Sequence, residues 1–394
     1  MKYDFDSVLN RRNTFSYKWN VKENELPMWV ADMDFQTAPE ITQALSDRVK
    51  SGVFGYTIVP DEWYNAYIGC WKTRHGFEMK KEWLSFCTGV IPAITSCVKR
   101  LTNHGDNVVV QTPVYNIFYN CVENSGRHIL ENPLVFDGKS YSIDFEDLKK
   151  KLAHPYTTLM ILCNPHNPVG TIWDAKTLSR IGALCYKYGV KVISDEIHCD
   201  ITEPNVGYVP FASVDDVCRE ISVTCLSVTK AFNLASLQSS AVCVPNEVIR
   251  NVVFRGLNSD EVAEPSAFAI EAAIAALEKG GEWLDELREY ISENKKYLRS
   301  YLADELSEVY VLPQNATYLV WVDVSKITDS SKDLCDYLRE KTGLIVTAGS
   351  SYHGDGNKFV RINVACPRST LEDGLSRFVK GCNAIKKSNA EIKC

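Results

Sequence analysis

Short apolar runs alternate with longer amphipathic stretches from residue 108 onward, and this alternation limits the possible folds more than any other feature. The apolar runs 108–110, 158–162 and 190–193 are separated by the amphipathic stretches 115–125 and 174–188. A short apolar run is typical of a buried strand, and a longer amphipathic stretch is typical of a helix. The order strand, helix, strand therefore predicts a parallel β-sheet with helical crossovers, and hence an α/β fold.

Residues at the ends of the amphipathic stretches indicate where helices begin and end. The stretch 174–188 begins with Asp174, which can cap a helix N-terminus, and is followed by Gly189, which favours a left-handed C-cap. Thr37 and Glu40 have the spacing of a capping box, so another helix is expected to open at this point.

The 394 residues contain no internal repeat, low-complexity tract or flexible linker, and this length favours two domains joined by structured segments. After the alternating middle, a long charged helix is expected over 283–302, followed by strands at 318–322 and 359–364. This α+β pattern differs from the middle of the chain. We predict an N-terminal arm and first helix that pack with the small domain (1–47), a large domain (48–285) and a small C-terminal domain (286–394).

Charge and composition exclude several classes of partner. Lys and Arg total 43 against 50 Asp and Glu, a net charge of −7, so the overall charge does not attract nucleic acid or anionic lipid. No apolar run is long enough to span a membrane and the charged N-terminus does not resemble a leader, so a cytoplasmic protein is expected. The 14 cysteines are then expected to be reduced, and none has the Cys-x-x-Cys spacing of zinc sites, so no metal is predicted.

Polar and aromatic side chains follow four of the apolar runs, at the points where parallel strands would end. They are Tyr115, Asn167, Asp195 and Lys230. In a doubly wound sheet the carboxyl ends of the strands border one crevice, so these side chains are expected to converge. Each has an ordinary structural explanation on its own: a packed ring, a turn, a helix cap and a lysine that reaches solvent. Their joint position at one sheet edge favours a functional site.

These residue types suit the chemistry of a pyridine aldehyde with a phosphate group. A desolvated lysine such as Lys230 has a lowered pKa and can condense with an aldehyde. A carboxylate such as Asp195 can keep a pyridine nitrogen protonated, which turns the ring into an electron sink. The start of the helix expected after 88–92 offers backbone N–H groups to a phosphate, and the hydroxyls of Ser227 and Thr229 lie beside the lysine in the sequence.

Four ordered motifs make the chain resemble a known family. They are NPHNPVG at 164–170, SDEIH at 194–198, SVTKAFN at 227–233 and RINVACP at 361–367. In order and separation they resemble the fold-type I pyridoxal-phosphate enzymes of the aminotransferase class I/II superfamily, and among these the MalY/PatB-type cystathionine β-lyases, or C-S lyases. The resemblance runs nearly end to end, from PMWVADMDF at 27–35 through FGYT at 54–57. It implies a large domain with a mixed, mostly parallel sheet flanked by helices, plus a smaller α+β domain.

The resemblance also implies roles for individual residues. The expected catalytic residues are Lys230, which would bond the cofactor, Asp195, which would pair with its pyridine nitrogen, and Tyr115, which would stack on its ring. The other expected cofactor-binding residues are Asn167, His198, Val90, Ile91, Ser227, Thr229 and, across a homodimer interface, Tyr56. The expected substrate-binding residues are Arg361, which would clamp the α-carboxylate, Asn167, Trp29 and Tyr56.

Departures from the aminotransferase pattern favour the lyase branch. His198 stands where many aminotransferases carry a tyrosine, and Gln238 stands where they often carry a phosphate-binding arginine. Ser236, in contrast, replaces a glycine common in the lyases, which leaves the local loop geometry open. A metal cluster of His198 with its acidic and cysteine neighbours is not expected, because successive side chains on an extended segment point in different directions.

We therefore expect a homodimeric pyridoxal-phosphate β-lyase that cleaves L-cystathionine, or another cysteine S-conjugate, into a thiol such as L-homocysteine, pyruvate and ammonia. An aminotransferase on the same frame and a cofactor-binding regulatory protein with incidental lyase activity are the alternatives. The preferred conjugate stays open, as does a role in methionine biosynthesis, sulfur scavenging or sulfide release.

Overall fold

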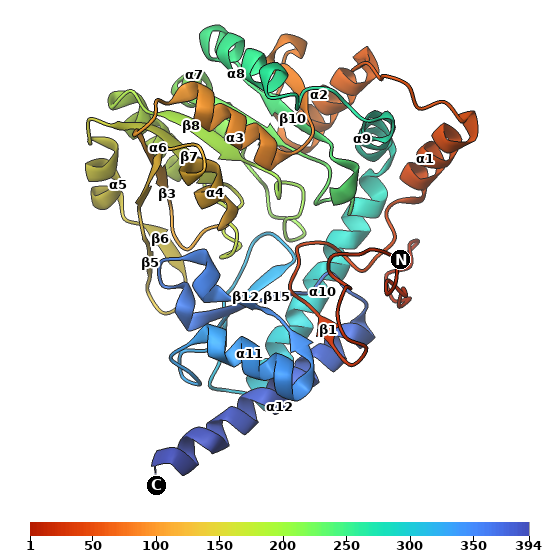
Figure 1. Ribbon diagram of the computed structural model, residues 1–394, viewed down its shortest axis with the longest axis vertical. Helices are drawn as coiled ribbons and strands as arrows, with labels where there is room; N and C mark the ends of the chain where they lie inside the picture. Colours follow the sequence, from red (N-terminus) through yellow and green to blue (C-terminus); the bar gives the residue numbers. More distant parts are fainter. Residues whose placement is uncertain (394) are drawn as a thin grey trace.

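A seven-stranded sheet forms the centre of the larger part of the molecule, shown in a computed structural model that describes residues 1–393, with side chains through residue 386 (Figure 1). The strands lie in the order β2 (Leu84–Cys87), β10 (Ser240–Cys243), β9 (Ser222–Leu226), β8 (Lys191–Asp195), β7 (Thr157–Cys163), β3 (Asn107–Val110) and β4 (His128–Glu131). Only β10 runs antiparallel to its neighbours β2 and β9. The predicted mixed, mostly parallel sheet is therefore confirmed.

Helices cover both faces of this sheet because the buried strands are apolar on both sides. One face carries α3 (Val90–Leu101), α4 (Ile117–Glu123) and α8 (Glu247–Ser259), and the other carries α5 (Phe145–Leu152), α6 (Ala175–Lys187) and α7 (Asp216–Ile221). In β7, Ile161 packs into the core of the first face, whereas Met160 and Leu162 pack into the second. This alternation of side chains is what a central parallel strand requires.

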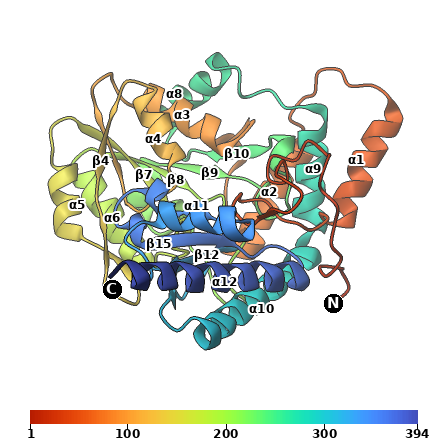
Figure 2. The same cartoon turned by 60° about the horizontal axis from the view of Figure 1, so that its bottom comes forward.

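A smaller antiparallel sheet is formed by the C-terminal part of the chain. Its strands are β11 (Tyr310–Val311), β12 (Leu319–Asp323), β15 (Phe359–Asn363) and β14 (Thr347–Ala348), in that order. Figure 2 shows α11 (Ser331–Thr342) and α12 (Arg368–Lys393) on either side of β12 and β15. The long helix α10 (Gly281–Glu305) lies against α12 and leads from the larger part into this one (Figure 1).

The first 75 residues touch both parts of the molecule. Strand β1 (Leu26–Pro27) pairs in parallel with β13 (Leu344–Ile345), beside the smaller sheet. Helix α1 (Pro39–Ser51) packs against α9 (Ala267–Lys279), as does α2 (Asp61–His75). The segment between α1 and α2 projects from the edge of the molecule (Figure 1). The remaining strands, β5 (Leu134–Phe136) and β6 (Tyr141–Ile143), form a separate hairpin.

The predicted helix ends are confirmed in one case and wrong in another. The side chain of Asp174 caps α6 by accepting a hydrogen bond from the Thr177 backbone N–H at 2.7 Å. At α1, however, the N-cap is Ala38, and the buried hydroxyl of Thr37 has no hydrogen-bond partner. The capping box fails because Pro39 takes the first helical position, so the helix starts one residue later than a Thr37 cap requires.

Two further expectations concern the whole chain. Among the described residues, no helix combines the length and the apolar character needed to cross a bilayer. The described cysteines are free thiols. The domain boundaries stay a prediction.

Candidate active site

A cavity of about 220 Å³ opens at the carboxyl ends of the central parallel strands. It is lined by Ala31, Gly89, Val90, Ile91, Pro92, Tyr115, Cys163, Asn167, Asp195, Ile197, His198 and Lys230. Seven of the residues predicted from sequence are among them: Lys230, Asp195, Tyr115, Asn167, His198, Val90 and Ile91. The strand ends therefore converge as the α/β pattern predicts, although the role of each side chain stays a prediction.

Lys230 enters the cavity from the loop that follows β9. Its Nζ donates a hydrogen bond to the backbone carbonyl of Ala31, which lies in the N-terminal segment. Burial lowers the pKa of Lys230 to about 8, an effect that Arg361 reinforces and the carboxylates of Asp32 and Asp195 oppose. A lowered pKa leaves more of the amine in the neutral, nucleophilic form at neutral pH.

Asp195 is the last residue of β8 and is almost fully buried. Its Oδ1 accepts a hydrogen bond from the Ile197 backbone N–H at 3.1 Å. Burial raises the pKa of Asp195 to about 6, against the opposing influence of that hydrogen bond and of Lys230. A buried carboxylate with one protein donor has acceptor capacity left for a cationic partner in the cavity.

The N-terminus of α3 forms another wall of the cavity. Gly89 is the N-cap, in an extended conformation, and Val90 and Ile91 follow it as the first helical residues. The first N–H groups of a helix have no partner inside the helix, and they carry the positive end of its dipole. This wall is therefore suited to an anionic group such as a phosphate.

Arg361 on β15 brings the smaller sheet to the cavity. One of its terminal nitrogens donates to Asn167 Oδ1 at 3.1 Å, and the other donates to the Trp29 carbonyl at 3.0 Å. The guanidinium also lies 5.0 Å from the ring centre of Tyr352. Its Nε is buried without a hydrogen-bond partner, so the arginine keeps a donor for a bound anion.

His198 lies in the cavity as a neutral ring. Burial lowers the pKa of its imidazole to about 3, and the positive charges of Lys230 and Arg361 add to this effect. Its Nδ1 is buried without a hydrogen-bond partner. The next residues face elsewhere: Asp200 pairs with His75, at 3.0 Å between Oδ1 and Nε2, beside a separate cavity.

Four of the predicted site residues do not line this cavity. Ser227 and Thr229 are buried behind Lys230, where their hydroxyls lie 2.7 Å apart. Trp29 contributes its backbone carbonyl to Arg361, and its indole N–H is buried without a partner. The side chain of Tyr56 is fully exposed on the segment between α1 and α2.

Sequence reasoning missed five of the lining residues: Ala31, Gly89, Pro92, Cys163 and Ile197. Ala31 matters most, because its carbonyl accepts hydrogen bonds from both Lys230 and the Tyr318 hydroxyl. Its segment was identified as a motif at 27–35, but it has no helical or strand periodicity that would indicate which backbone group faces the lysine.

Comparison with known proteins places the chain in a family. The sequence profile of aminotransferase class I and II matches residues 24–378, and the chain therefore belongs to this family. The resemblance inferred from the four motifs is confirmed.

Individual relatives narrow the likeness. Cystathionine beta-lyase PatB of Bacillus subtilis (strain 168) is 42% identical over 382 residues, which cover 95% of this chain and 98% of the relative. Protein MalY of Escherichia coli (strain K12) is 31% identical, over 98% of this chain and 100% of its own length. Cystalysin from Treponema denticola, whose crystal structure contains a pyridoxal 5'-phosphate cofactor, has a TM-score of 0.95 at 28% identity, over 98% of this chain and 100% of its own.

Proposed function

We propose that this protein is a pyridoxal-phosphate-dependent carbon–sulfur β-lyase that acts on L-cystathionine or a related cysteine S-conjugate. One observation carries the proposal: the Lys230 amine, the buried Asp195 carboxylate and the N-terminus of α3 border a single cavity. The names of the relatives PatB and MalY-like C-S lyases support the same activity.

The residues around the cavity fit this cofactor. Lys230 supplies the amine for its aldehyde, Asp195 a carboxylate for its pyridine nitrogen, and the first N–H groups of α3 a site for its phosphate. The partnerless His198 Nδ1 supports the fit, since a bound ligand with polar atoms would satisfy it. When bound, the cofactor supplies an electron sink that stabilises negative charge developing at the substrate Cα.

The protein's own side chains then divide the remaining work. Arg361 binds the α-carboxylate of the substrate through its guanidinium, which Asn167 and the Trp29 carbonyl hold in place. The Lys230 amine removes the Cα proton as general base and later returns a proton to the departing sulfur. With cystathionine and one water, the balanced products are homocysteine, pyruvate and ammonia.

The active unit in this proposal is a homodimer. The exposed segment between α1 and α2 carries Val53, Phe54, Tyr56 and Ile58, all exposed in the single chain. A cluster of exposed apolar side chains is typical of an interaction surface. We propose that a second copy covers it and that Tyr56 reaches the phosphate in the partner's cavity. The free cysteines support a reducing, cytoplasmic location.

Absorbance spectroscopy of the purified protein tests the proposal. We expect a visible band from the lysine-bound cofactor in the wild type and no such band in Lys230→Ala. Added L-cystathionine should yield pyruvate and free thiol in equal amounts. A band without these products, together with amino-group transfer to a keto acid, would identify an aminotransferase instead. A protein that shows no band even after pyridoxal phosphate is added would contradict the cofactor assignment.

A further inference from the structure

Residues 29–34, here called the strap, cross the cavity with their backbone toward the reactive side chains. The carbonyl of Ala31 accepts hydrogen bonds from Lys230 Nζ and, at 3.1 Å, from the Tyr318 hydroxyl. The carbonyl of Trp29 accepts from Arg361 at 3.0 Å. The strap thus contacts both the lysine and the arginine on which the proposed reaction depends, although it has no regular secondary structure.

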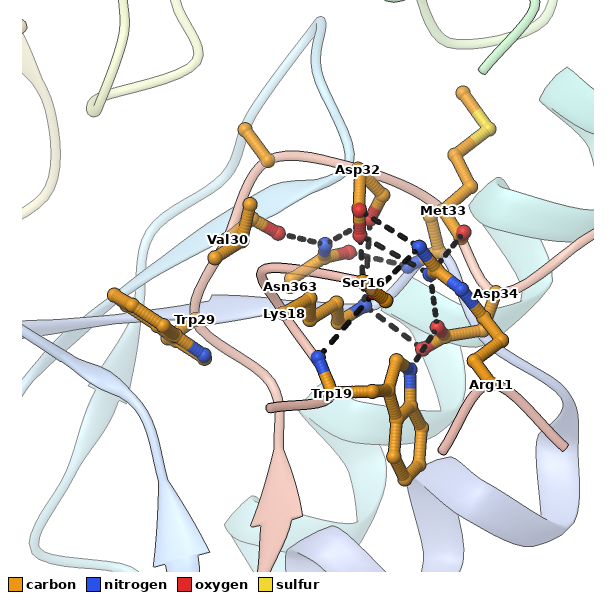
Figure 3. Close-up of polar contacts among 12 residues, drawn as sticks. Arg11, Ser16, Lys18, Trp19, Trp29, Val30, Asp32, Met33, Asp34 and Asn363 are labelled. Atoms are coloured by element: carbon orange, nitrogen blue, oxygen red, sulfur yellow. Dashed lines mark hydrogen bonds and ion pairs between the residues drawn. The ribbon is translucent and has the colours of Figure 1, made fainter. Parts of the chain in front are cut away.

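The strap is held from one side by β15. The side-chain amide of Asn363 donates to the carbonyls of Val30 and Asp32, at 2.6 Å each. Asn363 lies two residues after Arg361 on the same strand, so this contact fixes the strap relative to the arginine. Figure 3 shows both bonds.

An ion-pair network holds the strap from its other side. Lys18, only 1% exposed, places its Nζ 2.7 Å from Asp34 Oδ2 and 3.6 Å from Asp32 Oδ1. Arg11 reaches the same two carboxylates, with distances of 2.9 Å to Asp32 Oδ2 and 2.7 Å to Asp34 Oδ1 (Figure 3). Trp19 adds a hydrogen bond from its indole N–H to Asp34 at 2.7 Å. Two cations from the arm therefore neutralise two carboxylates of the strap.

Such a network is a costly way to attach an arm. Burying an ammonium group and its carboxylate partners removes them from water, and apolar side chains of similar size often hold a structure equally well. Ion pairs differ from apolar packing in being directional, so they fix the position of the groups that carry them. Here those groups are the two carboxylates of the segment that contacts Lys230.

We infer that Lys18 and Arg11 are positioning residues, whose ion pairs with Asp32 and Asp34 hold the strap so that the Ala31 carbonyl orients the Lys230 amine. The inference deepens the proposed function and rests on it for the role of Lys230. Neither residue touches the cavity itself, and both act through the strap.

Charge provides a second connection between the arm and the lysine. The charged groups that face the Lys230 amine are Asp32, Asp195 and Arg361, and the neutral His198 ring lies beside them. Asp32 raises the pKa of Lys230, and Lys18 lies on the far side of that carboxylate. Loss of the Lys18 charge should therefore raise the pKa of Lys230, whereas Asp32→Asn should lower it.

Hydrogen exchange measured by mass spectrometry tests the positioning. We expect peptides covering the strap to exchange at least about tenfold faster in Lys18→Met than in the wild type, because the variant leaves buried carboxylates without a partner. Glu25→Gln is the matched control. It removes another buried charge of the N-terminal segment, paired with Arg339 at 2.8 Å, that makes no contact with the strap.

A second measurement reads the lysine directly in the cofactor-free full-length chain. Competitive acetylation at a series of pH values, with the Lys230 peptide quantified by mass spectrometry, gives the pKa of its amine. We expect an upward shift in Lys18→Met, a downward shift in Asp32→Asn and none in Glu25→Gln. If Lys18→Met does not fold, Arg11→Met replaces it, since Arg11 is partly exposed and its loss should act in the same direction.

The outcomes separate this inference from the proposed function. Unchanged strap exchange in both arm variants would overturn the inference. Faster exchange with an unchanged Lys230 pKa would also overturn it, because the arm would then support only the fold. Failure of the wild type to release thiol and pyruvate would instead count against the proposed reaction, and would leave the exchange and acetylation results to stand.

Discussion

At the scale of single residues, burial controls the charge of the groups around the cavity. It raises the pKa of Asp195 to about 6 and lowers the pKa values of Lys230 and His198 to about 8 and 3. In each case burial is the largest influence, and neighbouring charges only modify it. The site is therefore arranged so that each of these groups gains from a bound partner that replaces lost water.

Asp195 links this burial to the stability of the cofactor-free protein. Its pKa is raised from 3.8 to about 6, so the folded state holds a proton that the unfolded chain releases between these values. The free energy of unfolding therefore falls as the pH rises through this window and stays lower above it. Asp195→Asn has no charge to bury, and it should raise the free energy of unfolding by about 1–3 kcal/mol near pH 7.5 and by less near pH 5.

Urea unfolding of the cofactor-free wild type and variant at the two pH values measures this difference. An equal stabilisation at both would mean that the effect comes from packing rather than from the carboxylate charge. The cofactor-loaded proteins should show the opposite order, since the proposed pyridine partner is lost in the variant.

The sequence predicts the residues that end strands better than those that lie in irregular segments. Lys230 and Asp195 are predictable because each follows an apolar run of a parallel sheet. Lys18 is not predictable in this way, since a lysine in an aperiodic arm is expected to be solvated, and only the fold brings Asp34 to it. Ser227 is another limit, because nearness to Lys230 in sequence does not bring its hydroxyl into the cavity.

At the scale of elements, two glycines provide opposite tests of local packing. Gly69 is exposed in the interior of α2, and a Cβ added there meets no atom within 4 Å. Gly349 is buried, and a Cβ added there would collide with the backbone carbonyls of Gly356 and Phe359. Gly69→Ala should therefore raise the free energy of unfolding by about 0.5–1 kcal/mol, and Gly349→Ala should lower it by about 1–3 kcal/mol.

Denaturant midpoints measured at constant slope give both values. The Gly349 change should also weaken substrate binding, because the same turn carries Tyr352, whose ring packs on Arg361. A neutral Gly349→Ala variant would show that the two turns can separate without cost.

Element types were more predictable than the details of their ends. The central strands and α6 follow from apolar runs and a capping Asp174. The order of strands in the large sheet does not, since β10 inserts between β2 and β9 although all three have similar apolar sequences. Long-range pairing of this kind depends on which helices cover each face, and no local pattern specifies it.

At the scale of the whole molecule, the proposed dimer makes a test with two inactive variants. Tyr56 is fully exposed in the single chain, so it is available to a second copy. Tyr56→Ala and Lys230→Ala should each lose activity on their own. If Tyr56 serves the partner's cavity, refolding the two together produces hybrid dimers in which one of two sites is intact, and about a quarter of wild-type activity should return.

Sedimentation analysis of the same mixture confirms that dimers have formed. A dimer that regains no activity would mean that Tyr56 acts within its own chain or not at all.

The pairing of β1 with β13 has a consequence for the order of events during synthesis. Leu26 emerges from the ribosome early, whereas its partner Leu344 is made close to the end of the chain. Domains generally begin to fold while later residues are still being added. The large sheet can thus assemble with its cavity open on one side, and the N-terminal segment closes over Lys230 only when translation is nearly complete. A nascent chain is therefore accessible to cofactor before the segment that later confines it has found its place.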